Sequence, residues 1–75
     1  MQVTIEQLNP IFSAAFGEEI RLSAETRKED IPAWDSVNHL SLIVELEEKL
    51  NVSFTTEEIP AIKSVKDLMR ILETR

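Results

Sequence analysis

The sequence contains no cysteine and only one histidine, His39. The lack of cysteine excludes disulfides, thiolate metal sites and a cysteine nucleophile, and it fits a reducing compartment. One histidine cannot form a cluster of histidine metal ligands. No stretch approaches the roughly 18 apolar residues that a transmembrane helix needs, and the amino terminus lacks a basic region followed by an apolar run. We therefore expect a soluble, cytoplasmic protein that holds no metal and does not insert into membranes.

Internal repeats, low-complexity tracts and glycine-serine linkers are also missing, and the single glycine is Gly17. The 75 residues are 43% hydrophobic and 29% charged, which is enough apolar material for a compact core. A chain of this length buries only about 60% of the surface that its unfolded form exposes. These features predict one small domain, residues 1–75, of modest stability.

Acidic residues exceed basic ones, and the excess lies in the middle of the chain. The net charge is −6, while residues 29–58 alone hold eight acidic residues and one lysine, a net charge of −7. Such a surface repels nucleic acid and anionic lipid and attracts basic patches on proteins. A solvated face kept acidic for solubility is the alternative interpretation. We expect protein partners, no nucleic acid partner, and a monomer.

The first helix is predicted to begin at Thr4, where Thr4 and Gln7 can form a capping box. Pro10 lacks an N–H and crowds the preceding turn, so the helix is either distorted there or starts afresh with Asn9 as its cap. We favour one distorted helix that ends at Gly17, a typical C-terminal stop. Its apolar residues recur at helical spacing: Ile5, Leu8, Phe12, Ala15 and Phe16.

Residues 17–34 show no periodicity, which predicts a long loop. A loop of this length in so small a domain generally has a function or packs on the core through its own side chains. Its apolar anchors are expected to be Ile20, Leu22, Ile31 and Trp34.

A second helix is predicted from Ser36 to about Leu50, capped by Asp35. Its apolar residues cover a broad arc, which predicts a central helix contacted by several others. Glu47 interrupts the arc without an evident reason. The arc consists of Val37, Leu40, Leu42, Ile43, Val44, Leu46 and Leu50.

Two further helices are expected towards the C-terminus. Thr55 and Glu58 can form a capping box for a short turn that stops near Pro60. Ser64 can cap a last helix with Asp67 in its first turn. No segment alternates with the period of a strand. The predicted fold is all-α: a small four-helix bundle of three main helices and one short helix, with a long loop between the first two.

Asp35, Ser36 and His39 together suggest a hydrolase, but their spacing does not support one. Asp35 and Ser36 are adjacent, and one helical turn does not hold His39 in a relay between them. We expect His39 to be an ordinary exposed or half-buried helix residue. The Ser36 hydroxyl projects at the positive end of a helix, which would suit a phosphate attached to it. A second capping residue is the other interpretation of Ser36.

The stretch "DIPAWDSV", followed by "HLSLIVELEEKLNVSF", resembles the acyl carrier proteins and the related carrier domains of polyketide and nonribosomal peptide synthesis. The hallmark of that family is Asp-Ser-Leu at the opening of the second helix. The resemblance covers nearly the whole chain and implies an acyl-carrier-like helical bundle. Here Ala33 stands where the family often has Gly, and Val37 replaces the Leu. The "WDS" variant resembles free-standing carriers, and Trp34 is expected to pack the loop onto the bundle.

The resemblance implies that Ser36 receives a 4'-phosphopantetheine from coenzyme A, added by a separate phosphopantetheinyl transferase. The arm then holds acyl groups as thioesters in fatty acid, polyketide or a related biosynthesis, so the protein is a carrier and not an enzyme. Asp35 would cap the helix and help to place the metal ion during transfer. Acyl-loading and acyl-processing enzymes with basic patches would contact an apolar and acidic face made of Val37, Val44, Glu45, Glu47 and Glu48.

Two other functions remain open at this point. The arm could carry aminoacyl or peptidyl groups. Alternatively, the chain could be an unmodified acidic helical module that binds one protein partner through the same face.

Overall fold

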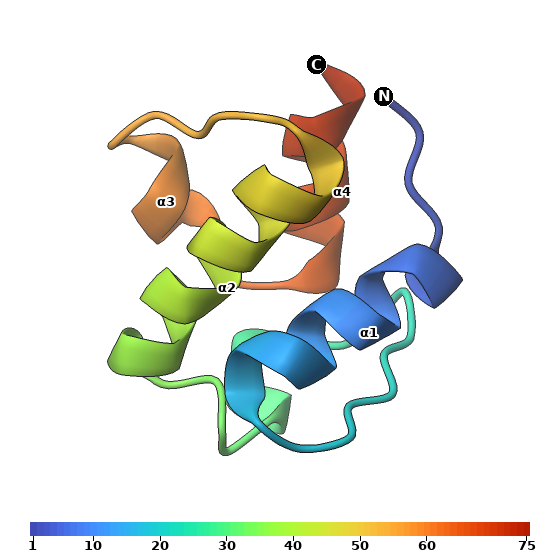
Figure 1. Cartoon of the computed structure of the whole chain (residues 1–75), viewed down its shortest axis with the longest axis vertical. Helices are drawn as coiled ribbons and strands as arrows, with labels where there is room; N and C mark the ends of the chain where they lie inside the picture. The colour runs from blue at the N-terminus through green and yellow to red at the C-terminus, as the bar shows by residue number, and fades with distance from the viewer.

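The computed structural model describes all 75 residues as a small helical bundle without a strand (Figure 1). The all-α prediction, with three main helices and one short one, is confirmed. None of the helices is both long and apolar enough to cross a lipid bilayer. In chain order the elements are α1 (Ile5–Phe16), the 3-10 helix η1 (Lys28–Asp30), α2 (Ser36–Leu50), α3 (Glu58–Ala61) and α4 (Val65–Glu73).

Helix α1 begins and ends at the residues that the sequence predicts. The Thr4 hydroxyl accepts a bond from the Gln7 N–H at 3.2 Å, and the Gln7 side chain accepts one from the Thr4 N–H at 2.8 Å. Gly17 stops the helix at φ 72°, a left-handed conformation that costs glycine little. The helix runs through Pro10 in one piece, so the prediction of a single helix is confirmed.

Asn9 lies inside α1 and is not a helix cap. Its side chain instead holds the loop that follows the helix. The Asn9 Oδ1 accepts the Leu22 N–H at 2.8 Å, and the Ser13 hydroxyl accepts the Ile20 N–H at 2.8 Å. Because the side chains of Ile20 and Leu22 are buried, their backbone N–H groups need acceptors within the protein, and these bonds supply them. The loop is therefore fastened along α1.

The loop between α1 and α2 contains η1, which the sequence analysis missed. Its three residues are all charged, so no hydrophobic period marks them. The loop also pairs with the start of α4, where the Val65 N–H donates to the Thr26 oxygen at 2.9 Å. Three of the predicted anchors, Ile20, Leu22 and Trp34, are buried, and Ile31 is half-buried.

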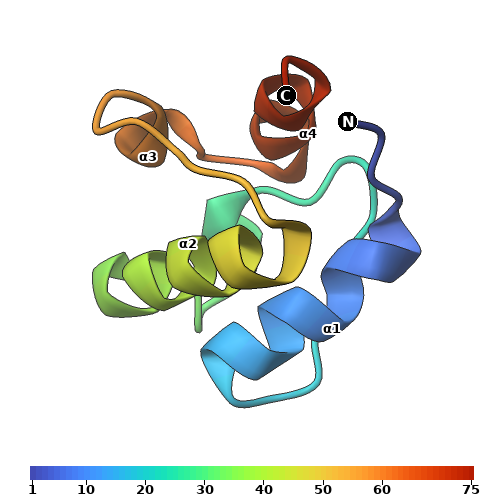
Figure 2. The same cartoon turned by 45° about the horizontal axis from the view of Figure 1, so that its top comes forward.

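Helix α2 is not the enclosed central helix that its broad apolar arc predicts. It packs chiefly on α1. Leu42, Ile43 and Leu46 are buried, whereas Val37, Leu40 and Val44 are 74%, 59% and 54% exposed. The arc was wider than one buried face because it joins two surfaces, one that faces the core and one that faces solvent. Figure 2 shows α1 and α2 side by side at an angle in the lower half of the molecule, with no helix covering the outer side of α2.

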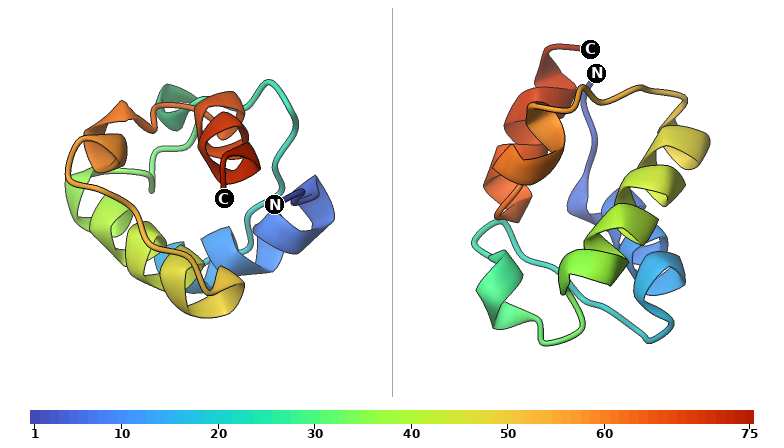
Figure 3. Two further views of the ribbon diagram at one scale, coloured as in Figure 1. Left: turned by 90° about the horizontal axis from the view of Figure 1, so that it is seen from above. Right: turned by 90° about the vertical axis from the view of Figure 1, so that its left-hand side faces the viewer.

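The C-terminal third closes the bundle. Thr55 and Glu58 exchange the two predicted backbone bonds, at 3.0 and 3.1 Å, although α3 itself begins only at Glu58 and contains Pro60. The Ser64 hydroxyl caps α4 by accepting the Asp67 N–H at 3.1 Å. The two chain ends lie side by side in every view, and the Met1 ammonium donates to the carbonyl oxygen of Arg75 at 2.6 Å (Figure 3).

The core lies between α1, α2 and α4 and includes the loop anchors. It is apolar apart from His39, which belongs to α2. Its buried hydrophobic members are Leu8, Ile11, Phe12, Phe16, Ile20, Leu22, Trp34, Leu42, Ile43, Leu46, Ile62, Val65, Leu68 and Leu72.

Candidate attachment site at the start of α2

Ser36 is the first residue of α2, and it is exposed. The cap of the helix is Asp35, whose Oδ1 accepts the Asn38 N–H at 2.8 Å. Because Asp35 fills the capping position, the interpretation of Ser36 as a second cap is not needed to explain the helix start. Ser36 is therefore an exposed residue with a hydroxyl group, at the electropositive end of a helix of 15 residues.

The segment that leads into Ser36 is held by a bond from the first turn of α2 and by a backbone bond of its own. The Asn38 side chain donates to the Ala33 oxygen at 2.7 Å, and the Trp34 N–H donates to the Ile31 oxygen at 2.9 Å. With the Asp35 cap, these contacts fix the backbone on the N-terminal side of the serine. The exposed hydroxyl is thus displayed from a well-supported turn.

Trp34 packs the loop onto the bundle, as predicted from the sequence. It is 3% exposed, and its ring meets the ring of Phe12 edge to face, with centroids 5.2 Å apart. The ring of Phe16 also packs against the indole, with the two ring centroids 6.0 Å apart. Aromatic contacts of this kind add to the burial of the indole.

His39 is buried, which contradicts the prediction of an exposed or half-buried helix residue. Only 6% of it is exposed, and its Nδ1 accepts the indole N–H of Trp34 at 2.8 Å. Its Nε2 lies 2.7 Å from the carbonyl oxygen of Ile59. Helical spacing places His39 on the apolar side of α2, and that position was the missed signal. Both ring nitrogens are engaged away from Ser36, so the hydrolase hypothesis has no general base.

A strip of exposed apolar side chains runs along α2 from the residue that follows Ser36. It consists of Val37, Leu40 and Val44, and we call it the apolar strip. Val37 and Val44 were predicted from the sequence to lie on a partner face, whereas Leu40 was assigned only to the apolar arc. A shallow groove of about 290 Å³ adjoins the strip where α1 meets α2. It is lined by Ala14, Ala15, Ser41, Val44 and Glu45.

The three acidic residues assigned to the same face differ in their surroundings. Glu45 is half-buried and pairs with Lys49 at 3.2 Å. Glu47 is half-buried, and its Oε2 accepts the Phe54 N–H at 2.9 Å, which explains why an acid interrupts the apolar arc. Glu48 is exposed. Glu45 and Glu47 therefore have partners within the chain.

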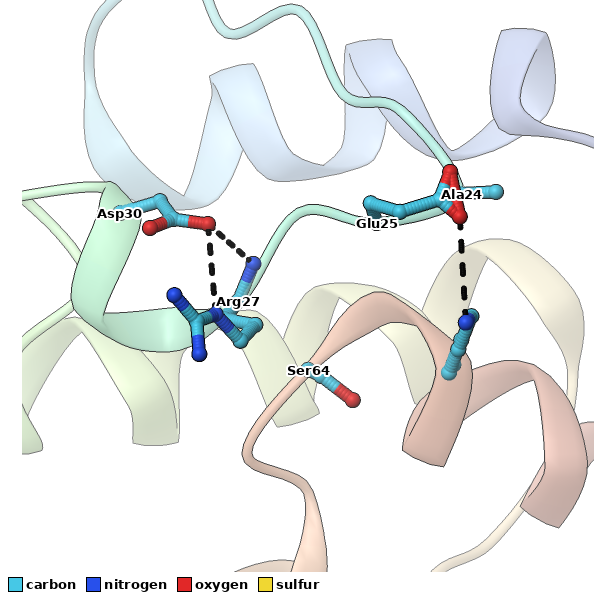
Figure 4. Close-up of a pocket in the computed structure, with 6 residues that line it drawn as sticks. Ala24, Glu25, Arg27, Asp30 and Ser64 are labelled. Atoms are coloured by element: carbon cyan, nitrogen blue, oxygen red, sulfur yellow. Dashed lines mark hydrogen bonds and ion pairs between the residues drawn. The ribbon is translucent and has the colours of Figure 1, made fainter.

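The largest pocket, of about 420 Å³, lies elsewhere, between the loop and the start of α4 (Figure 4). Its bases are paired with acids: Arg27 lies 3.8 Å from Asp30, and Lys66 lies 3.8 Å from Glu25. Ser64, on its wall, caps α4. The polar groups that line this pocket therefore hold the loop and α4 together.

No family model matches the chain, but two comparisons with known proteins give the same result. The chain is 36% identical to the acyl carrier protein of Wolinella succinogenes, over 97% of this chain and 87% of that protein. The chain belongs to the acyl carrier protein family. Its fold is similar to the solution NMR structure of the holo acyl carrier protein from Geobacter metallireducens, with a TM-score of 0.83. That match has 39% sequence identity and covers 95% of this chain and 83% of the other.

Membership of this family supports a carrier role. The position of the acyl-carrier motif, at the Asp35–Ser36 turn, coincides with the exposed hydroxyl described above.

Proposed function

We propose that this acyl carrier protein holds acyl groups as thioesters on a 4'-phosphopantetheine attached to Ser36, and delivers them between biosynthetic enzymes. The observation that carries the proposal is the exposed Ser36 hydroxyl at the start of α2, in a chain of this family. Residues 1–75 would act as one carrier domain, as a monomer in the cytoplasm. The proposal covers fatty acid, polyketide and related pathways.

The residues around Ser36 fit a phosphodiester. The first N–H groups of a helix have no acceptor within it, and here the Asp35 carboxylate occupies that of Asn38. A phosphodiester on Ser36 would place its negative charge at the favourable end of α2. When bound, the group supplies a terminal thiol for thioester formation. The chain itself supplies the anchoring oxygen, the capped turn and the exposed surface beside it.

The attachment is a substitution at phosphorus. The Ser36 oxygen bonds to the phosphorus that carries the pantetheine in coenzyme A, and the pyrophosphate bond to the nucleotide half breaks. The hydroxyl proton passes to a base, and 3',5'-adenosine diphosphate leaves. The His39 ring nitrogens are engaged with Trp34 and Ile59, so His39 is not the base, and we propose that the transferase supplies it. Asp35 is exposed, and its carboxylate would help to position the metal ion of that reaction.

The partner face comprises the apolar strip and the acids beside it. Its proposed members are Val37, Leu40, Val44, Glu45, Glu47 and Glu48. Partner enzymes with basic patches would be attracted to the acids and would bury the apolar strip. Charge attraction raises the association rate without requiring tight binding, which suits a shuttle that must leave each enzyme in turn.

The test is to incubate the purified chain with coenzyme A and a broad-specificity phosphopantetheinyl transferase, and to weigh the intact protein. We expect a gain of one phosphopantetheinyl group. Ser36→Ala should abolish the gain, and Ser53→Ala, at another exposed serine, should not. An unmodified wild-type chain would favour the alternative of an acidic interaction module, and a gain that survives Ser36→Ala would reject the attachment site.

A further inference from the structure

The imidazole of His39 connects three parts of the fold. The indole N–H of Trp34 can only donate, so His39 Nδ1 must accept that bond at 2.8 Å. The carbonyl oxygen of Ile59 can only accept, so Nε2 must carry the ring proton and donate at 2.7 Å. The two contacts together select one neutral tautomer of the ring. We call this connection, Trp34–His39–Ile59, the imidazole bridge.

One end of the imidazole bridge lies in α3, which cannot be stable alone. The helix has four residues, none of them buried, and its only side-chain capping is the local exchange of bonds between Thr55 and Glu58. A single helical turn does not repay the entropy of its own nucleation, so contacts from outside must order it. The bond from His39 to the Ile59 oxygen is one such contact, and the Glu58–Arg75 ion pair is another.

The other end of the imidazole bridge lies two residues before Ser36. Trp34 is fixed by the rings of Phe12 and Phe16 on one side and by His39 on the other. Any rotation of the imidazole would therefore break a bond to the serine-bearing turn and a bond to α3 at the same time. In Figure 1, α3 lies alongside α2. In the sequence, all of α2 separates α3 from the turn that carries Ser36.

We propose that His39 is a positioning residue that couples the Ser36 turn to α3, so that the two are ordered together for recognition by enzymes that act on Ser36. The inference rests on the proposed attachment at Ser36. An enzyme that requires both elements in place binds only the fraction of molecules in which they are ordered. Weakening the imidazole bridge therefore lowers apparent affinity by that fraction.

The coupling can be read directly by NMR, because Trp34 and His39 are the only tryptophan and histidine of the chain. The wild-type ring should show a bare Nδ1 and a protonated Nε2, with a slowly exchanging indole N–H. Trp34→Phe removes the donor and keeps an aromatic ring. We expect amides of α3 to exchange roughly fivefold to tenfold faster in this variant, relative to amides of α4. Equal exchange in α3 would overturn the coupling.

The functional arm uses transferase kinetics with the full chain as the substrate. His39→Leu keeps an apolar side chain and removes both bonds, so KM should rise about fivefold to tenfold while kcat changes less than about twofold. His39→Gln offers an amide oxygen to Trp34 and an amide N–H to Ile59, and it should recover most of the loss. Leu72→Val, a core change in α4 that leaves both bonds of His39 in place, controls for general destabilisation and should leave KM unchanged.

The outcomes separate this inference from the proposed function. A wild-type chain that is never modified would reject the attachment at Ser36, while the exchange experiment would still judge the imidazole bridge. A wild-type chain that is modified normally, with His39→Leu equally good as a substrate, would reject the role of His39 alone. Equal impairment of His39→Gln and His39→Leu would also contradict it.

Discussion

Asp35 and Ser36 are neighbours at the start of α2, and their side chains have separate roles. The Asp35 carboxylate accepts a backbone N–H of the first turn, while the Ser36 hydroxyl stands exposed. The division explains why the motif needs both residue types in this order. A capping acid must precede the helix, and a serine at the first helical position projects from its positive end.

Removing the cap should destabilise the fold. We expect Asp35→Ala to lower the free energy of unfolding by about 1 kcal/mol, because an orphan N–H of α2 loses its acceptor. Asp35→Asn keeps an oxygen at that position and should lose much less. Urea unfolding followed by circular dichroism measures the difference. Equal stability of Asp35→Ala and wild type would show that water replaces the carboxylate at no cost.

Glu47 and Glu48 are adjacent acids that should respond differently to mutation. Glu47→Ala leaves the half-buried Phe54 N–H without its acceptor and should cost about 1–2 kcal/mol of unfolding free energy. Glu48→Ala, at an exposed position, should leave stability within about 0.5 kcal/mol and weaken only the binding of basic partners. Thermal unfolding of the two variants side by side tests this. Equal losses would contradict the structural role of Glu47.

At the scale of elements, α3 depends on charge. The Thr55 N–H, together with the guanidinium of Arg75, holds the pKa of the Glu58 carboxyl below its usual value of 4.5. A lowered pKa in the folded state means that the charged form stabilises the fold at pH above the usual value. This contribution is lost as pH falls through the folded pKa. The order of α3 should therefore weaken in acid before its hydrophobic contacts do.

The corresponding variant is Glu58→Gln, which keeps the shape of the side chain and removes its charge. It should be less stable than wild type at neutral pH, and the two curves of stability against pH should converge as the pH falls through the lowered folded pKa of Glu58. Chemical unfolding at a series of pH values gives both curves. Parallel curves would show that the pairing of Glu58 with Arg75 and Thr55 contributes nothing to stability.

The elements could be predicted from the sequence where their signals are local. Thr4, Gly17, Asp35 and Ser64 mark helix ends because each bonds, or adopts a turn conformation, within its own few residues. The η1 turn has no such signal, since it is ordered by contacts with the start of α4. Local signals thus fixed the helix boundaries but not the course of the loop.

The face that each residue of α2 presents could be predicted only in part. The sequence shows which residues are apolar, but burial depends on where neighbouring helices lie. For this reason Leu40 was assigned only to the arc and is exposed. His39 was expected to be exposed or half-buried and is buried, although its helical spacing already placed it on the apolar side of α2. The Asp35 cap and the start of α2 at Ser36 were predicted correctly, because their signals lie within a single turn, whereas attachment at Ser36 stays a prediction.

At the scale of the whole molecule, the uneven charge should limit stability. The chain carries a net charge of −6, and the acids concentrate between residues 29 and 58. Repulsion among them should be screened by salt, so sodium chloride or a divalent cation should raise the melting temperature. A melting temperature that is unchanged or falls would show that the acids are spread apart or already paired.

The most direct measurement is made on the chain isolated from its native host under conditions that leave a thioester intact. Fragmentation of the peptide that spans residue 36 would locate any attached group and release its cargo for identification. We predict a phosphopantetheinyl group on the Ser36 oxygen, with an acyl group on its thiol in part of the population. A chain that carries no such group, from cells in which other carriers are modified, would contradict the carrier account.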